Sequence, residues 1–398
     1  MEKFEFFNPV HIFFGVGELS RVGEEAKKLG KKALLVTYSE HHYLDPVICR
    51  VENLLNKNGV EFVRYFRVTP NPTINQAKEG VKISKAADVD LVIGLGGGSA
   101  MDTAKMVAAG VFYQGDLWNM VYSRHDNSKN VIPPEKALPI LMIPTLPATG
   151  SEMNPTAVVT NQETHEKSYT WSNCLYPKIS IVDPQLTCSL PTFQTACAAA
   201  DTISHVLEFY LTGYEDAFLN NRIQEGVIQT VLEYVPKVLK DPNDVNSRGH
   251  LQWAAIVALN GWSQPGDGWT PMHQLGHVLS AQYNITHGAS LSIIMPAWMK
   301  HFYKSRLEQY VNLAVNVFGV EQSMSKENIA LEGIKRFEEF LRSIEVPTSL
   351  SDVNIEEDAI DFLTSEVVKI SFNADNKLQG RPPASRKDVK SVFSLAKS

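Results

Sequence analysis

The stretch that decides the fold is Leu91–Lys105, LVIGLGGGSAMDTAK. An apolar strand, Leu91–Gly94, runs into a cluster of glycines, and a helix follows from Ser99 to about Ala109. Glycines let the backbone approach a phosphate closely, and the first N–H groups of the helix point toward it. The Ser99 side chain can cap the helix and offer a hydroxyl. We therefore predict a phosphate-binding turn at the carboxyl end of a parallel sheet.

The glycine spacing departs from the usual dinucleotide-binding pattern G-x-G-x-x-G, because Ser99 stands where the third glycine is expected. The turn also comes late, since the first strand-to-helix turn, after Thr37, has no glycine. A tight glycine turn without a ligand is the alternative interpretation. The order of strand, glycines and helix favours the phosphate site.

Strand and helix patterns alternate on both sides of this stretch, which predicts βαβ units and a doubly wound, mostly parallel α/β sheet. The expected strands are Lys32–Thr37, Glu61–Phe66, Leu138–Ile143 and Ile179–Val182, and the expected helices are Pro46–Asn58 and Ile74–Ala87. Beyond Pro184 and Pro191 only helical patterns are convincing. They are Thr192–Leu211, Ala217–Leu239, Ser247–Trp262, Thr270–Tyr283 and Ala330–Ser343. We expect an α/β domain over residues 1–187 and an all-helical domain over 188–398.

The composition is that of an ordinary globular protein, with 398 residues, 44% hydrophobic and 20% charged. A net charge of −7 argues against a nucleic-acid partner, which usually requires a basic face. No apolar run is long enough to span a membrane, the N-terminus lacks the pattern of a signal peptide, and the four cysteines form no C-x-x-C pair. A cytoplasmic enzyme without a membrane partner is the expectation.

Three of the eleven histidines fall close together in WTPMHQLGHVLSAQYNITHG, residues 269–288. Thr270 is a favourable N-cap and Pro271 a favourable first residue, so a helix should begin there and carry His273 and His277 on one face. His287 follows shortly, just before a glycine. By spacing alone, either histidine of the helical pair could bind a metal.

A second helix, in AAADTISHVLEFY, carries Asp201 and His205 four residues apart and should end at Gly213. Three imidazoles and one carboxylate suit a borderline divalent metal such as Fe²⁺ or Zn²⁺. A surface pair is the alternative for Asp201 and His205. The H-E-x-x-H pattern of zinc proteases is absent, because residue 274 is Gln. The remaining histidines have no comparable neighbours and are expected to be solvent or core residues: His11, His41, His42, His125, His165, His250 and His301.

Nearly the whole chain resembles the iron-dependent (group III) alcohol dehydrogenases, especially the butanol-dehydrogenase-like branch that reduces short aldehydes. The motifs that carry the resemblance are, in order, NPVHIFFGVGEL, VTPNPT, GGGSAMDTAK, IPTLPATGSEMN, YPKISIVDP, AADTISHVLEFY and HQLGHVLSAQYNITHGASLSIIMPAW. The resemblance implies a Rossmann-like domain followed by a helical metal-binding domain. It further implies an NAD(H) or NADP(H) cofactor, one divalent metal, and a homodimer.

The same resemblance implies roles for individual residues. The metal ligands would be Asp201, His205, His273 and His287, with His277 beside the nicotinamide without binding the metal. Gly97, Gly98 and Ser99 would hold the pyrophosphate, and Asp102 would lie close to the nicotinamide end. Thr145, Leu146, Thr149 and Ser151 would line the nucleotide, and Lys167 would approach a ribose.

One departure from the branch concerns the adenosine ribose, where many members have Y-G-G-G-S and this chain has Tyr38-Ser39-Glu40-His41-His42. A carboxylate at Glu40 would accept hydrogen bonds from ribose hydroxyls and repel a 2′-phosphate, which favours NAD(H). Ser39 or His41 could instead receive the phosphate. The cofactor preference therefore stays open, with NAD(H) favoured.

The expected chemistry is hydride transfer between the nicotinamide and a short alcohol or aldehyde whose oxygen the metal polarises. His277 is the candidate catalytic residue as a proton relay, with simple lining of the site as the alternative. A glycerol or polyol dehydrogenase is the nearest competing function. A dehydroquinate-synthase-like lyase would need many basic residues, and Ile256–Gly288 contains no Lys or Arg. A metal hydrolase and a non-catalytic metal-binding protein are less consistent with the glycine turn.

Overall fold

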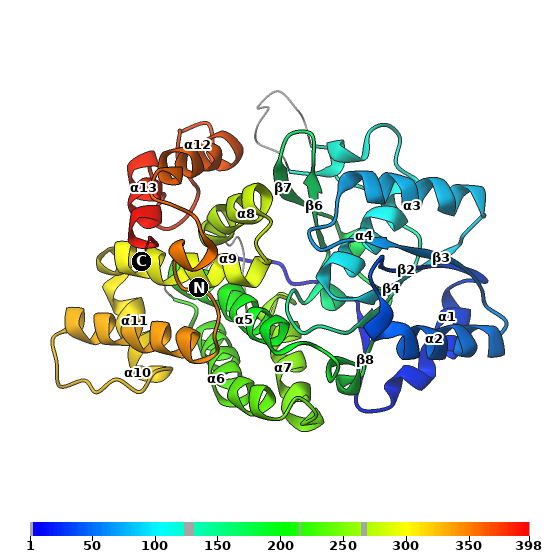
Figure 1. Ribbon diagram of the computed structural model, residues 1–398, viewed down its shortest axis with the longest axis horizontal. Coiled ribbons are helices and arrows are strands. Elements are labelled where there is room, and N and C mark those ends of the chain that lie inside the picture. Colours follow the sequence, from blue (N-terminus) through cyan, green and yellow to red (C-terminus); the bar gives the residue numbers. More distant parts are fainter. Residues whose placement is uncertain (1–2, 123–130, 215, 264–268, 398) are drawn as a thin grey trace. The chain divides into compact units, whose positions relative to one another are not determined.

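A computed structural model describes residues 3–122, 131–214, 216–263 and 269–397 of the chain. Its residue contacts divide the chain into two compact units (Figure 1). The sheet unit comprises Phe7–Leu190 and Asp241–Ile256. The helical unit comprises Met1–Phe6, Pro191–Lys240 and Val257–Ser398. The segment Asp241–Ile256 thus joins the sheet unit although it lies late in the sequence.

The sheet unit is built on six parallel strands in the order β1-β8-β5-β4-β2-β3. Strands β8, β4 and β5 are buried at every residue, as expected for a parallel sheet that is covered on both faces. The bounds are β1 His11–Phe14, β2 Lys32–Tyr38, β3 Glu61–Val68, β4 Leu91–Gly96, β5 Ile140–Pro144 and β8 Ile179–Val182. The prediction of an N-terminal doubly wound parallel sheet is confirmed.

Helices cover both faces of this sheet (Figure 1). On one face α1 (Val22–Leu29) and α2 (Asp45–Lys57) bury their apolar sides in a core that includes Leu35 and Ile93. On the other face lie α3 (Ile74–Ala86) and α4 (Gly98–Gly110). Helix α7 (Val245–Ala258) places Ile256 beside Met153 and Val182. Two apolar layers therefore hold the strand ends in register.

Four strands and helices of this unit, β1, α1, β6 and β7, were not predicted from the residue pattern. Strand β1 was recognised only through the family resemblance, and the helix α1 was not recognised at all. An antiparallel hairpin of β6 (Thr156–Asn161) and β7 (Glu166–Trp171) also lies outside the main sheet. Its turn contains none of the Asn-Gly or Asp-Gly pairs that mark a hairpin in sequence, which explains the omission.

The helical unit consists of eight α-helices over its described residues, and no strand element occurs there. The long, almost completely buried α5 (Thr192–Thr212) packs against α6 (Phe218–Lys240) and α9 (His287–Phe302). Helix α8 (Pro271–Tyr283) packs against α9. The others are α10 Leu307–Asn316, α11 Lys326–Ser343, α12 Ala359–Ser371 and α13 Arg386–Leu395. The prediction of a C-terminal helical region is confirmed.

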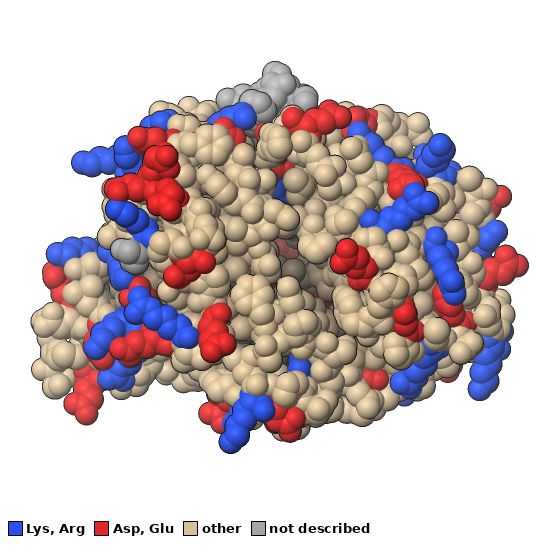
Figure 2. All heavy atoms as spheres, viewed as in Figure 1, with Lys and Arg blue, Asp and Glu red and all other residues tan. Residues whose placement is uncertain are grey.

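The described surface is mixed in charge. Figure 2 shows acidic and basic side chains interspersed over the face in view. Among the described helices, none combines the length and the apolar character needed to cross a membrane. His125, one of the histidines set aside above, lies outside the described residues.

Candidate metal centre and dinucleotide site

Helices α5 and α8 bring a carboxylate and two imidazoles together in the helical unit. Asp201 and His205 lie one turn apart on α5, and His273 projects from the first turn of α8. One ligand atom from each of the three lies within 4.8 Å of those of the other two, and all three residues are buried. The His205 Nε2 atom is 3.8 Å from the Asp201 carboxylate, and the rings of His205 and His273 stack at 5.0 Å.

The first residue of α9, His287, joins this group from a third helix. Its Nε2 atom is 3.5 Å from the same Asp201 oxygen that faces His205. Gly288 makes this approach possible, because a Cβ there would lie 1.9 Å from the backbone oxygen of Cys197, one turn before Asp201 on α5. Any side chain at position 288 would push α9 and its histidine away from α5.

The donor set fits a divalent metal. Two Nε2 atoms face one carboxylate oxygen, and the third imidazole belongs to the same buried cluster, as in protein sites for iron or zinc. Burial, reinforced by the nearby His273, keeps the pKa of His205 well below its usual value. Its imidazole is therefore neutral near neutral pH, which is the form that binds a metal.

Sequence reasoning missed Glu208, the residue that orients His273. Its fully buried carboxylate lies 2.5 Å from His273 Nδ1, so the opposite nitrogen, Nε2, is the one available to a metal. The same carboxylate accepts hydrogen bonds from the backbone N–H groups of Met272 and His273, the latter at 3.1 Å. A signal was present, because Glu208 lies three residues after His205 on the same face of α5.

Glu208 also replaces the cap that the sequence predicted for α8. The helix begins at Pro271 as expected, but the Thr270 side chain makes no capping hydrogen bond. The Thr270 cap is therefore a wrong prediction, and a carboxylate from α5 supplies the acceptor instead. Helix α5 ends at Thr212, before Gly213, as predicted.

His277 lies one turn after His273 on α8 and is also buried. Its ring centre is 6.0 Å from that of His273 and 5.3 Å from that of His287. Neither His277 nor His287 belongs to the set of three whose ligand atoms converge, but His287 places its Nε2 atom 3.5 Å from the Asp201 carboxylate. His277 therefore borders the cluster on α8.

In the sheet unit, the glycine turn connects β4 to α4 as predicted. Gly96 has a φ of +145°, which side-chain-bearing residues rarely adopt. Helix α4 begins at Gly98 with Gly97 as N-cap, so Ser99 lies in the first turn and does not cap the helix, contrary to the prediction. The helix offers no carbonyl to the N–H groups of Gly98 and Ser99, which leaves them suited to an anion.

Several predicted nucleotide-binding residues gather against this turn. The Thr145 N–H donates to the Gly96 carbonyl at 2.9 Å. A Cβ on Gly97 would lie 3.2 Å from the Leu146 side chain, and one on Gly98 would lie 2.5 Å from the Thr149 methyl group. The loop after β5 therefore covers the turn after β4. A larger residue at Gly97 or Gly98 would push this loop away from the turn.

Tyr38, at the end of β2, is a further contact that sequence reasoning did not assign. Its hydroxyl accepts a hydrogen bond from the Gly97 N–H at 3.1 Å, and burial raises its pKa. The chain places β3 on one side of β2 and β4 on the other, so the topological switch point lies between β2 and β4. Ligands of open α/β sheets bind at such points.

Of the remaining predicted residues, Ser39 and Glu40 follow β2 and are exposed. The Ser39 N–H donates to the Val68 carbonyl at 2.9 Å. Lys167 lies on β7, and its ammonium donates to the Asn71 side chain at 2.9 Å, in the turn after β3. These residues thus sit at the carboxyl ends of β2 and β3.

Asp102 and Ser151 are bound to each other, with the Ser151 hydroxyl donating to the Asp102 carboxylate at 2.7 Å. The other carboxylate oxygen accepts from the Val158 N–H at 3.0 Å, so Asp102 joins α4 to β6. Burial raises the pKa of Asp102. Two more buried charges lie nearby, Lys105 and Glu152, which sequence reasoning did not single out.

Lys105 donates to the carbonyls of Asn154 and Thr156 at 2.8 Å each, and burial lowers its pKa to about 8. Burial raises the pKa of Glu152 to about 7. Glu152 is almost completely buried, with 1% of its surface exposed. The ionised form of Glu152 is therefore the costly one in the folded chain.

Comparison with known proteins assigns the class. Residues 9–184 match the family "Iron-containing alcohol dehydrogenase", and residues 195–396 match "Fe-containing alcohol dehydrogenase family, C-terminal". The chain belongs to the iron-containing alcohol dehydrogenase family. It is accordingly an NAD(P)-dependent alcohol oxidoreductase that uses a divalent metal.

Individual relatives are similar to this chain over nearly its full length. The chain is 36% identical over 395 residues to NADH-dependent butanol dehydrogenase A of Clostridium acetobutylicum, covering 99% of each chain. It is 29% identical to the NADPH-dependent aldehyde reductase YqhD of Escherichia coli, covering 92% of this chain and 93% of the relative. The structure of NADH-dependent butanol dehydrogenase A from Thermotoga maritima is similar, with a TM-score of 0.92, 38% identity, and coverage of 100% and 99%.

The substitution Glu208→Gln should weaken metal binding while the fold survives. The amide keeps an oxygen for the backbone N–H groups of α8, but its NH₂ group faces His273 Nδ1 and favours the tautomer that is protonated on Nε2. A change in this kind of supporting partner typically costs 10–100-fold in metal affinity. Competition with a fluorescent chelator measures the affinity directly, without any assay of turnover.

Glu225→Gln is the matched control, because Glu225 is a buried carboxylate of the same unit that binds Tyr210 and Arg222. Its metal affinity should equal that of the unmodified protein. Equal affinities for Glu208→Gln and the unmodified protein would show that His273 is oriented by other contacts.

Glu152→Gln should change how stability depends on pH. Burial raises the pKa of this carboxyl from 4.5 to about 7 in the folded chain. Its contribution to the free energy of unfolding, relative to that of an ionised carboxyl, is therefore complete below pH 4.5. The contribution is lost as the pH rises through 7. Glutamine cannot ionise, so the variant should gain stability relative to the unmodified protein between pH 5 and about 8, by at most about 3 kcal/mol.

Thermal unfolding of both proteins at a series of pH values measures this difference. The exposed Glu61, whose side chain is 78% accessible, provides the control Glu61→Gln. A stability difference that stays constant with pH for Glu152→Gln would mean that the buried carboxyl does not titrate in this range.

Proposed function

We propose that the chain is a metal-dependent, NAD(P)-linked alcohol dehydrogenase and aldehyde reductase that acts on short primary alcohols and aldehydes, with butanol and butanal as representative substrates. The observation that carries the proposal is the buried convergence of Asp201, His205 and His273, supported by Glu208. The names of the relatives, butanol dehydrogenase and aldehyde reductase, support the substrate class. The test is loss of the reduced-nicotinamide absorbance on mixing with butanal.

Asp201, His205, His273 and His287 would hold the metal, which when bound supplies Lewis-acid polarisation of the substrate oxygen. The protein's own residues do the rest. His277, buried beside His287, would pass a proton between the substrate oxygen and solvent, and the helical backbone fixes its position. Burial of the cluster excludes water and so strengthens the electrostatic interactions of these side chains.

The nucleotide would lie at the carboxyl ends of β2 and β4. The N–H groups at the start of α4 would face the pyrophosphate, and Tyr38 would share or release its hydrogen bond with Gly97 when the phosphates enter. The loop after β5 would close over the dinucleotide. The full set of proposed nucleotide-binding residues is Ser39, Glu40, Gly97, Gly98, Ser99, Asp102, Thr145, Leu146, Thr149, Ser151 and Lys167.

A polyol dehydrogenase and a dehydroquinate-synthase-like lyase are less well supported. The relatives reported above carry names that specify alcohols and aldehydes. Either Fe²⁺ or Zn²⁺ suits the donor set, since geometry and availability decide between such metals more than affinity does.

We further propose that the enzyme is a cytoplasmic homodimer with its domain boundary after residue 187. Free thiols at all four cysteines agree with a reducing compartment. Phe218 and Leu219 at the start of α6 are 75% and 70% exposed, which offers apolar surface to a second copy. Light scattering coupled to size exclusion measures the mass in solution.

His273→Ala and His277→Ala should have different phenotypes, although both residues lie on one face of α8. Removing His273 deletes one of four proposed ligands, so most of the metal should be lost together with activity. His277→Ala should keep about one metal ion per chain, and its kcat should fall by about 10²-fold or more if the residue transfers protons. Atomic absorption and butanal reduction, measured on the same preparations, separate the two.

The opposite pattern, in which His277→Ala loses the metal and His273→Ala retains it, would exchange the two roles. His301→Ala is a suitable control, because His301 lies on α9 and binds Asp388 away from this cluster. Its metal content and kcat should not change.

Glu40→Gln should shift the cofactor preference toward NADPH. The unmodified enzyme should use NADH better, because the carboxylate accepts hydrogen bonds from the ribose hydroxyls and repels a 2′-phosphate. The substitution removes the repulsion and weakens the acceptor, so the ratio of kcat/KM values for NADH and NADPH should fall. A large preference of the unmodified enzyme for NADPH would contradict the assignment of Glu40.

A further inference from the structure

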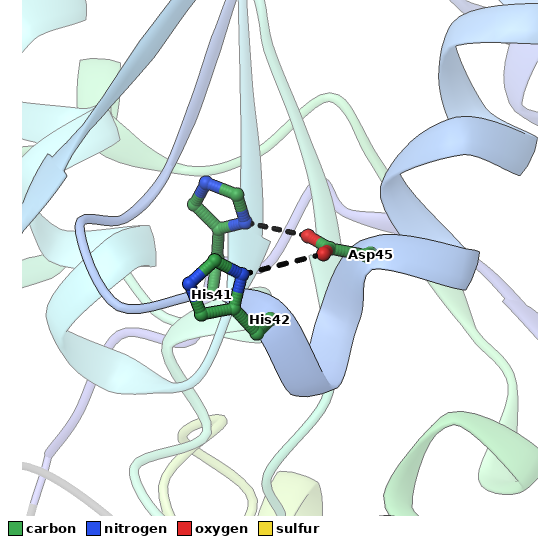
Figure 3. A group of neighbouring side chains, drawn as sticks. All are labelled: His41, His42 and Asp45. Carbon is green, nitrogen blue, oxygen red and sulfur yellow. Dashed lines mark hydrogen bonds and ion pairs between the residues drawn. The ribbon is translucent and has the colours of Figure 1, made fainter.

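A second group of side chains that could hold a metal lies in the sheet unit, far in sequence from the proposed ligands of the helical unit. It consists of His41, His42 and Asp45, which follow β2 (Figure 3). His41 Nδ1 lies 2.7 Å from one oxygen of the Asp45 carboxylate, and His42 Nδ1 lies 3.4 Å from the other. One ligand atom from each of the three residues lies within 4.8 Å of the others.

The backbone brings these residues together before any ligand binds. The segment His42–Leu44 forms one turn of 3₁₀ helix, and α2 begins at Asp45. This tight turn places His41 and Asp45 on the same side of the chain. The His41 ring also packs edge-on against Phe66 of β3, with ring centres 5.1 Å apart, and its side chain is only 24% exposed. One imidazole and the carboxylate are therefore already held in place.

The chemistry of the group is selective among cations. Two imidazoles and one carboxylate suit Zn²⁺, Cu²⁺ or Ni²⁺, whereas Mg²⁺ and Ca²⁺ prefer oxygen ligands. The His42 side chain is 91% exposed, so it can rotate to complete a three-residue site, and water can fill the remaining coordination positions. Ordering this exposed side chain costs conformational entropy, which limits the affinity.

We propose that His41, His42 and Asp45 form a second, exchangeable site for a divalent transition metal. Zn²⁺ is the ion used to test it. The site differs from the helical-unit cluster in its exposure, since solvent reaches all three residues. It needs neither the proposed activity nor a bound cofactor.

Occupancy of this site should weaken cofactor binding, a consequence that rests on the proposed function. Ser39 and Glu40 directly precede the ligands, and Tyr38 contacts Gly97 of the glycine turn. A dication held beside the exposed Glu40 attracts its carboxylate away from the ribose hydroxyls. Zinc should therefore raise the KM for NADH and leave kcat unchanged.

The binding test uses tag-free enzyme that carries one Zn²⁺ per chain in the helical unit, so that exchange there is thermally silent. Calorimetric titration with ZnCl₂ in a non-chelating buffer should show one further ion per chain in the micromolar range. The affinity should fall at least about tenfold in His41→Asn and in Asp45→Asn, each of which removes one of three ligands.

The matched control is His301→Asn, because His301 forms a single pair with Asp388 at 3.0 Å and has no second histidine in that pair. Its zinc titration should match that of the unmodified enzyme. Uptake of no further ion by the unmodified enzyme would overturn the proposal, as would equal losses in His41→Asn and His301→Asn.

Steady-state kinetics with and without one equivalent of extra zinc then test the coupling to the cofactor. An increase in the KM for NADH that is absent in His41→Asn supports it. Saturated binding without any change in KM would overturn the coupling and leave the metal site standing. Failure of the zinc-loaded enzyme to oxidise NADH would count against the proposed function alone, because the site itself is measured by binding.

Discussion

The hydrogen bonds of the Glu208 carboxylate are the interaction on which the helical unit's site depends. A fully buried carboxylate is costly unless its oxygens are satisfied, and here they accept two backbone N–H groups at the start of α8 and face one imidazole. The same contacts set the position of α8 against α5 and the orientation of His273. Gly288 does the equivalent for α9, since its missing side chain lets His287 approach Asp201. Folding thus brings the proposed metal ligands together.

The sheet unit depends on a different constraint, the close approach of backbone at the glycine turn. Gly96 adopts a left-handed conformation, and Gly98 has no room for a side chain beside Thr149. The consequence is a helix N-terminus whose N–H groups open at the point where the strand order reverses between β2 and β4. The Tyr38 hydroxyl accepts a hydrogen bond from the N–H of Gly97, the N-cap of α4, which links the end of β2 to the proposed nucleotide site.

The sequence predicted best what depends on periodicity and on spacing within one element. The strand Ile179–Val182 and the pairs Asp201/His205 and His273/His277 follow from local patterns, and the structure has them where expected. Contacts between elements were harder. In the sequence, little distinguishes Glu208 from other helical glutamates, because its role depends on its contact with α8. The Thr270 cap was predicted from local sequence, and the structure does not form it. His41 and His42 were set aside as histidines without comparable neighbours, although Asp45 lies four and three residues after them, and the structure brings the three side chains together.

The two histidine–carboxylate groups offer a metal the same kinds of ligand atom. They differ in whether the fold or the bound metal orders the side chains. At Asp201, His205 and His273 the rotamers are fixed by burial, by ring stacking and by Glu208, so binding a metal costs little further entropy. At His41, His42 and Asp45 one ring is packed against Phe66 while the other is open to solvent. A metal there must order that side chain itself, and water competes for every position. On these proposals, the buried group would retain its ion and the exposed group would exchange it, so the exposed group would respond to the free concentration of the metal.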